Sequence, residues 1–161
     1  QAAVLAGQMT RLEGIASSRA KLGNLLNAEI SGIPGITPHE VHAEDRCVYW
    51  FNMFRIDPAA FTVDRGQIYK ALRAEGVVCS PGYIPEPVHR SDVFKNHAFF
   101  NGHWTIKEAG MTDMDYTKVE TPEAEAILQT GMRVFIKEYM TEEQITQFAS
   151  GIRKVAKHYA V

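Results

Sequence analysis

The sequence lacks an apolar run long enough to cross a bilayer, and it has no excess of charge of one sign. A membrane-spanning helix needs about 20 consecutive apolar residues, and no segment of the 161 residues approaches that length. Lysine and arginine total 17 against 19 aspartate and glutamate, a net charge of −2, which leaves no basic surplus for nucleic-acid phosphates or anionic lipid. No basic and apolar leader opens the chain. We therefore expect a cytoplasmic protein that binds neither nucleic acid nor membranes.

Cysteine is also scarce. The two cysteines, Cys47 and Cys79, are too few for a disulfide-dense scaffold, and isolated thiols in an apolar-rich chain are more typical of reduced core residues. Hydrophobic residues make up 45% of the chain and charged residues 22%, which is the composition of a globular protein with a sizeable core. The length fits one core, or one core with an extension.

Residues 1–30 have the periodicity of one long helix, because apolar residues recur at three- and four-residue steps: Val4, Leu5, Met9, Leu12, Ile15, Leu22, Leu25, Leu26 and Ile30. A helix of about 28 residues would extend ~42 Å, which indicates a two-stranded coiled coil or a connector from another domain. Gln1 stands inside this pattern without a capping residue before it, so we expect a segment upstream. Gly32 and Pro34 end the helix, and a polar linker follows to residue 46.

Residues 47–161 alternate strand and helix signals. Aromatic and β-branched residues predict a strand over 47–57, and a short strand over 77–79. Asp64 with Gln67 predicts a helix start, as does Thr141 with Gln144 in the last helix. A helix from residue 122 to Gly131 and a strand over 132–136 lie between them. The expected fold is α+β: a small two-layer domain whose short, mostly antiparallel sheet has helices packed on one face, preceded by the long N-terminal connector helix.

The polar linker concentrates potential metal ligands: His39, His42, Glu44 and Asp45, with Cys47 close behind. Their spacing matches neither a His-Glu-x-x-His helix nor a paired Cys-x-x-Cys site. A metal-dependent hydrolase built on these residues is therefore the weakest hypothesis, and we interpret the segment as a solvated linker without a metal.

The stretch from about residue 80 to 119 has few regular signals, and loops longer than ~15 residues in a compact domain are usually functional or mobile. Its polar and aromatic residues could supply a general base or bind an anion: His89, Arg90, Lys95, His97, His103 and Trp104. No nucleophile motif or phosphate-binding glycine run accompanies them. Tyr83 either directs its hydroxyl into a cleft or packs as an aromatic plug. The residues alone predict a binding or accessory domain of something larger.

The order and spacing of several segments resemble the DegT/StrS-type sugar aminotransferases, which are pyridoxal-phosphate enzymes of fold type I. Residues 1–19 are similar to the helix that leaves the large domain of those enzymes, and residues 49–57 to the first strand of their small domain. Further similar segments are residues 71–77, Gly82-Tyr83, Pro87-Val88-His89 with Phe94, Ala124-Glu125, residues 139–145 and residues 152–155. The spacing of residues 73–76 and the segment of residues 87–90 resemble most the branch that acts on cyclitol ketones.

The resemblance implies a small-domain fragment of an enzyme that transfers an amino group from glutamine or glutamate to a keto-sugar or cyclitol ketone. Residues 1–30 would be a connector helix from a large cofactor-binding domain, residues 31–46 a linker and residues 47–161 the C-terminal small domain. The family's cofactor lysine would lie upstream of Gln1, so no catalytic residue is expected here. This chain alone is expected to bind no pyridoxal phosphate and to be inactive. Family members are typically homodimers.

The resemblance also nominates substrate-side residues. Tyr83 and His89 would line the acceptor, with Ser80, Arg90 and Phe94 behind them. The family often has histidine where this chain has Gly82, which is a departure at a substrate contact. The alternative is a non-catalytic module of the same fold that binds a small polyol through this loop, and it predicts that the chain alone binds the polyol.

Overall fold

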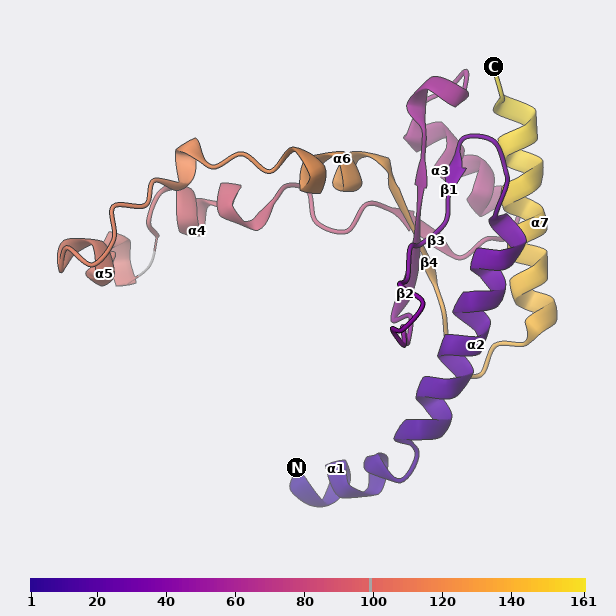
Figure 1. Ribbon diagram of the computed structural model, residues 1–161, viewed down its shortest axis with the longest axis horizontal. Coiled ribbons are helices and arrows are strands. Elements are labelled where there is room, and N and C mark those ends of the chain that lie inside the picture. Colours follow the sequence, from indigo (N-terminus) through magenta and orange to yellow (C-terminus); the bar gives the residue numbers. More distant parts are fainter. Residues whose placement is uncertain (99) are drawn as a thin grey trace. The chain divides into compact units, whose positions relative to one another are not determined.

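Figure 1 shows the computed structural model, which describes residues 1–98 and 100–161. The chain forms two compact units. The core unit comprises residues 1–81 and 130–161, and the insert unit comprises residues 82–129. Along the sequence, the insert unit therefore lies between two strands of the core unit.

The core unit is built on a four-stranded antiparallel sheet with the order β1-β2-β4-β3. Its strands are β1 (Ile36–Thr37), β2 (Phe51–Ile56), β3 (Cys79–Pro81) and β4 (Gly131–Phe135). In the central pair Phe54 lies opposite Met132, and on the other side of β4 Cys79 lies opposite Val134. Because side chains alternate between the faces of a strand, this register places all four of these apolar side chains on one face.

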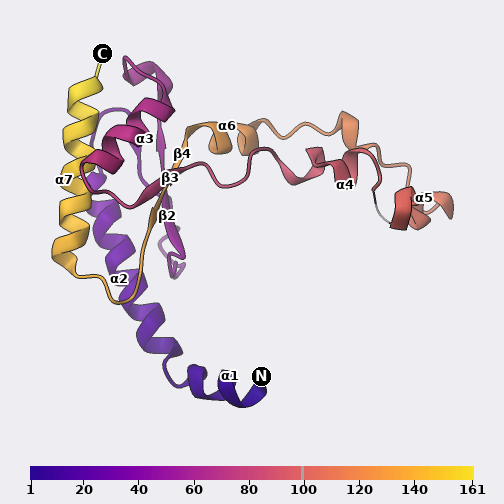
Figure 2. The ribbon, with the colours of Figure 1, turned by 180° about the vertical axis from the view of Figure 1, so that it is seen from behind.

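Three helices cover that face. Figures 1 and 2, seen from opposite sides, show α2 (Leu12–Ile30), α3 (Arg65–Ala74) and α7 (Glu142–Tyr159) together on one side of the sheet. The core between the two layers includes Leu26, Ile30, Phe54, Leu72, Met132, Val134, Ile145 and Ile152, each at most 1% exposed. Burying one such side chain contributes about 1.5–3 kcal/mol. The predicted α+β fold, with a short antiparallel sheet and helices on one face, is confirmed.

The N-terminal segment is helical as expected, but it is two helices and not one. α1 (Ala2–Met9) ends before α2 begins at Leu12. The Thr10 hydroxyl donates to the Gly7 carbonyl at 2.9 Å, and the Arg11 amide donates to the carbonyl three residues back. These bonds interrupt the i to i−4 pattern of an α-helix. α1 has no buried residue, so no packing keeps the two helices continuous.

The strand predicted over 47–57 begins later, at Phe51. Tyr49 has a φ of 42°, which is a left-handed conformation that ends an extended run. Its side chain is 1% exposed, and its hydroxyl donates to Asn24 Oδ1 at 2.7 Å and accepts from Asn27 Nδ2 at 3.1 Å. Asn52 Nδ2 donates to Asn27 Oδ1 at 2.7 Å. A buried polar network therefore replaces part of the expected strand.

Both predicted helix caps are present. Asp64 Oδ1 accepts from the Gln67 amide at 2.8 Å at the start of α3, although the Gln67 side chain does not return to residue 64. At α7 the reciprocal pair is complete, with Gln144 N donating to Thr141 Oγ1 and Thr141 N donating to Gln144 Oε1. Such a cap is worth about 1 kcal/mol.

The insert unit contains short helices where the sequence predicted an irregular stretch. They are η2 (Val88–Arg90), α4 (Asp92–Lys95), η3 (Phe100–Gly102), α5 (Thr105–Glu108) and η4 (Tyr116–Lys118). The helix predicted from residue 122 to Gly131 is present as α6 (Pro122–Thr130), most of which also belongs to the insert unit. A further short helix, η1 (Pro58–Ala60), lies in the core unit. None of the helices in residues 1–98 and 100–161 combines the length and apolar composition needed to cross a membrane.

Candidate functional site

Four of the five residues predicted at the substrate lie in the insert unit, namely Tyr83, His89, Arg90 and Phe94, and Ser80 lies on β3 of the core unit. The Ser80 hydroxyl oxygen is shielded from solvent and has no hydrogen-bond partner among the described residues. Tyr83 is 48% exposed and follows Gly82, whose φ of 59° costs glycine nothing. A role for the five residues in binding substrate stays a prediction.

Arg90 and His89 are held by the short helix η2, which packs on α4 and η4. Arg90 Nη2 donates to Glu125 Oε1 of α6 at 2.6 Å, so part of its charge is already balanced. His89 is partly buried, and its Nε2 has no hydrogen-bond partner within the described chain. A shielded polar atom without a partner costs free energy, so this nitrogen is a natural contact for a polar ligand.

A series of aromatic rings continues from the predicted Phe94. The Phe94 and Tyr116 rings meet edge to face with centroids 5.2 Å apart, and Tyr116 stacks on Trp104 at 5.4 Å. The centroid of the His97 ring lies 4.9 Å from that of Trp104. The sequence analysis did not identify Tyr116 as a site residue, because it is far from Phe94 along the chain. The only indication in the sequence was that Tyr116 is an aromatic residue within a polar stretch.

A cavity of about 450 Å³ opens beside Tyr116, a volume within the range of small-molecule sites. Its lining mixes charges of both signs with polar groups: Glu86, Arg90, Lys95, Tyr116, Thr117, Lys118, Val119 and Glu120. Next to it, hydrogen bonds from Thr117 and Lys118 lower the pKa of Asp115 from 3.8 to about 2, which keeps that carboxylate ionised at neutral pH. This lining suits a polar, hydroxyl-bearing ligand better than an apolar one.

The candidate ligand side chains of the polar linker do not come together as a metal site in the part of the chain that the structure describes. His39 Nδ1 accepts from the Met53 amide at 3.1 Å, and burial lowers the pKa of this imidazole. His42, Glu44 and Asp45 are exposed. Among the described residues no group of three or more histidine, cysteine, aspartate or glutamate side chains could hold a metal ion. Both cysteines are free thiols, with Cys79 buried and Cys47 partly buried.

The lysines can be tested against the cofactor that the resemblance implies. A lysine that binds pyridoxal phosphate is activated by desolvation or by a neighbouring cation. Every lysine of this chain is exposed except Lys137, which is partly exposed. The residues present therefore do not fit the cofactor's lysine site.

The sequence model of the DegT/DnrJ/EryC1/StrS aminotransferase family matches residues 1–153. A curated relative from Streptomyces kanamyceticus is 32% identical over 111 residues, which are 66% of this chain and 25% of that protein. It carries the provisional name L-glutamine:3-amino-2,3-dideoxy-scyllo-inosose aminotransferase. The chain thus spans about a quarter of the length of the curated relative that it matches.

Solved structures share the fold at lower identity. DesV of S. venezuelae, in complex with a ketimine intermediate, has a TM-score of 0.71 at 20% identity over 98% of this chain and 36% of its own. Helicobacter pylori PseC, involved in the biosynthesis of pseudoaminic acid, has a TM-score of 0.71 at 12% identity over 96% of this chain and 36% of its own. The chain belongs to the DegT/DnrJ/EryC1/StrS aminotransferase family, whose aminotransferases use pyridoxal phosphate.

Proposed function

We propose that this chain is the small-domain part of a cytoplasmic, homodimeric aminotransferase that transfers an amino group from glutamine or glutamate to a keto-sugar or cyclitol ketone. The match of the family over residues 1–153 carries the proposal, and the name of the Streptomyces relative supports a cyclitol ketone and a glutamine donor. In this assignment residues 1–30 connect to the large domain, residues 31–46 form a linker and residues 47–161 form the small domain.

Pyridoxal phosphate supplies the electron sink for amino transfer, and in this proposal the lysine that holds it lies in the large domain. The role of this chain would be to bind and orient the acceptor and to exclude water from it. His89 would donate to or accept from a hydroxyl of the acceptor, because its Nε2 has no partner among the described residues. Tyr83, which is 48% exposed, would contribute its hydroxyl, and Ser80, Arg90 and Phe94 would support these contacts.

The proposal is tested by steady-state kinetics of Tyr83→Phe and His89→Ala in the full-length enzyme. Loss of one hydrogen bond to the acceptor is expected to reduce kcat/KM for the acceptor about tenfold, while kcat/KM for the amino donor is unchanged. His103→Ala is the matched control, because this histidine of the insert unit is exposed and pairs with Glu108. Wild-type kinetics for both variants would remove Tyr83 and His89 from the site.

The domain assignment has a separate test. Residues 1–161 alone, mixed with pyridoxal phosphate and desalted, are expected to retain no cofactor absorbance, because no lysine here is buried. A retained absorbance would show that a lysine of this chain binds the cofactor, and the assignment of the lysine to the large domain would then be wrong.

A further inference from the structure

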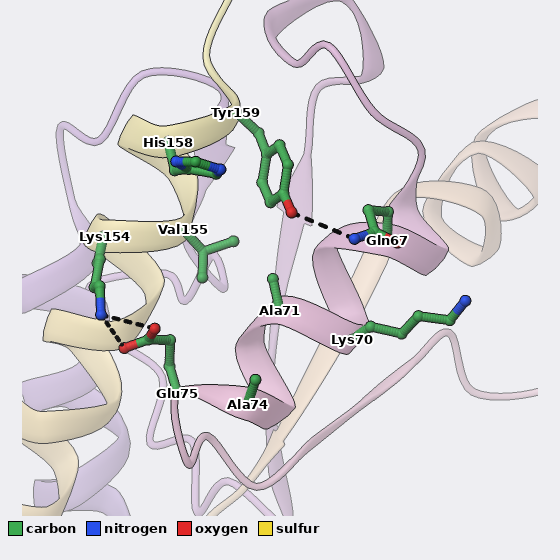
Figure 3. A pocket seen from close by; sticks show the side chains of 9 residues that line it. All are labelled: Gln67, Lys70, Ala71, Ala74, Glu75, Lys154, Val155, His158 and Tyr159. Atoms are coloured by element: carbon green, nitrogen blue, oxygen red, sulfur yellow. Dashed lines mark hydrogen bonds and ion pairs between the residues drawn. The ribbon is translucent and has the colours of Figure 1, made fainter.

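A groove of about 480 Å³ lies between α3 and α7 in the core unit, and its lining includes none of the residues of the proposed function. Two polar pairs join the helices across it (Figure 3). Lys154 Nζ lies 2.8 Å from both carboxylate oxygens of Glu75, and Gln67 Nε2 donates to Tyr159 Oη at 3.3 Å. These pairs link α3 to α7 at two separate points along the groove.

Between the two pairs the helices present small side chains. Ala71 and Ala74 lie on α3, and Val155 lies on α7 below the ring of Tyr159. Because alanine leaves the facing positions unfilled, the helices enclose a space within the range of small-molecule sites. The carbonyl of Tyr159 accepts from both the amide and the hydroxyl of Thr62 at 2.8 and 3.1 Å, so the residue that forms one wall is fixed in place.

The polar groups left over at this groove include two donors, beside the His158 ring, which meets the Tyr159 ring edge to face with centroids 4.6 Å apart. Both oxygens of Glu75, the only carboxylate of the lining, already accept from Lys154. The Tyr159 oxygen accepts from Gln67, which leaves its own hydrogen to donate. Lys70 at the rim has no carboxylate partner in the part of the chain that the structure describes, and a lysine ammonium only donates.

We propose that this groove binds a small organic anion with a flat apolar body. The apolar body would lie on Ala71, Ala74 and the Tyr159 ring, and its carboxylate or phosphate would accept from the Tyr159 hydroxyl and from the Lys70 ammonium group at the rim. Charge-assisted hydrogen bonds of this kind are stronger than neutral ones. This inference does not depend on the proposed aminotransferase activity.

The test is an amide NMR titration of the ¹⁵N-labelled chain with benzoate, benzamide and phenyl phosphate. Benzoate or phenyl phosphate is expected to shift the amides of residues 67–75 and 154–159 saturably, with a Kd of about 1 mM or below. Whichever of the two binds more tightly identifies the preferred anionic group. Benzamide, which has the same shape without the charge, is expected to bind at least about tenfold more weakly.

Variants of the chain distinguish specific binding in the groove from non-specific attraction of an anion to the surface charge. Tyr159→Phe keeps the aromatic ring and removes the hydroxyl donor. It should raise the Kd for the anion several-fold, as should Lys70→Gln. Lys157→Gln is the matched control, because it removes the same charge from an exposed position of α7 outside the lining, and it should leave the Kd unchanged. Ala74→Leu fills the groove from an exposed position and should abolish binding. Unsaturable shifts, equal binding of benzamide, or an equal effect of Lys157→Gln would overturn the proposal.

Discussion

His39 joins the linker to β2, one of the two central strands of the sheet, through a hydrogen bond that requires a neutral imidazole ring. The Met53 amide donates to His39 Nδ1 at 3.1 Å, and a protonated imidazole has no lone pair to accept it. The His39 ring also meets the ring of buried Tyr49 edge to face, with centroids 5.4 Å apart. Partial burial lowers the pKa of His39 below its ordinary value of 6.5, so the folded state favours the neutral imidazole.

This preference gives the chain a pH-dependent stability. Between the lowered pKa and 6.5 the unfolded chain binds more protons at this residue than the folded chain, so the free energy of unfolding should be highest above pH 6.5 and fall as the pH drops below it. Urea unfolding at pH 7.5, 6.5 and 5.5 measures the slope, which His39→Gln should flatten. His42→Gln, an exposed neighbour in the same segment, should retain the wild-type slope; a slope equal in all three proteins would contradict the role of His39.

At the scale of elements, α2 contains two glycines in opposite environments. A Cβ built on Gly23 would overlap the ring of Tyr49, whereas a Cβ on Gly14 meets nothing within 4 Å. Alanine in a helix interior is favoured over glycine by about 0.5–1 kcal/mol, but overpacking a buried position costs about 1–3 kcal/mol. We therefore expect Gly14→Ala to stabilise the chain by about 0.5–1 kcal/mol and Gly23→Ala to destabilise it by about 1–2 kcal/mol.

Chemical denaturation followed by far-ultraviolet circular dichroism measures both glycine variants, and each is the control for the other. Equal stabilisation by the two substitutions would show that Tyr49 moves aside freely. In that case the contact between α2 and Tyr49 would not hold the loop before β2 in place.

The elements that were predictable from the sequence are those fixed by local chemistry. Thr141 and Gln144 form the complete cap at the start of α7, because both partners lie within one turn. The conformation of Tyr49 was not predictable, because its aromatic side chain favours a strand and its left-handed φ is maintained by Asn24 and Asn27, which are distant in the sequence.

The same distinction holds for the candidate site. The insert was recognisable as a loop with histidine and aromatic residues, and Arg90 was nominated from its position in a similar segment. Its pairing with Glu125 and the stacking of Tyr116 on Trp104 join residues far apart in the sequence. Side chains that meet only through tertiary packing leave no periodic signal in the sequence. These two contacts therefore could not be predicted from the sequence and are seen only in the three-dimensional structure.

At the scale of the whole chain, the clearest surface feature is apolar. α1 and the start of α2 expose Val4 at 70%, Leu5 at 62%, Met9 at 55% and Leu12 at 52%. Contiguous exposed apolar residues of this kind mark interaction surfaces more often than isolated ones do. The net charge of −2 offers little repulsion between copies, so two chains can approach through this segment.

We therefore expect the 161-residue chain to self-associate through α1, with a weight-average mass that rises with concentration in sedimentation equilibrium. Leu5→Glu together with Met9→Glu places charge in the apolar contact and should raise the dimer Kd at least about tenfold. Met111→Glu is the matched control, because this methionine of the insert unit is 78% exposed and lies outside α1. A strictly monomeric wild-type chain, or an equal effect of Met111→Glu, would show that α1 does not pair two copies of this chain.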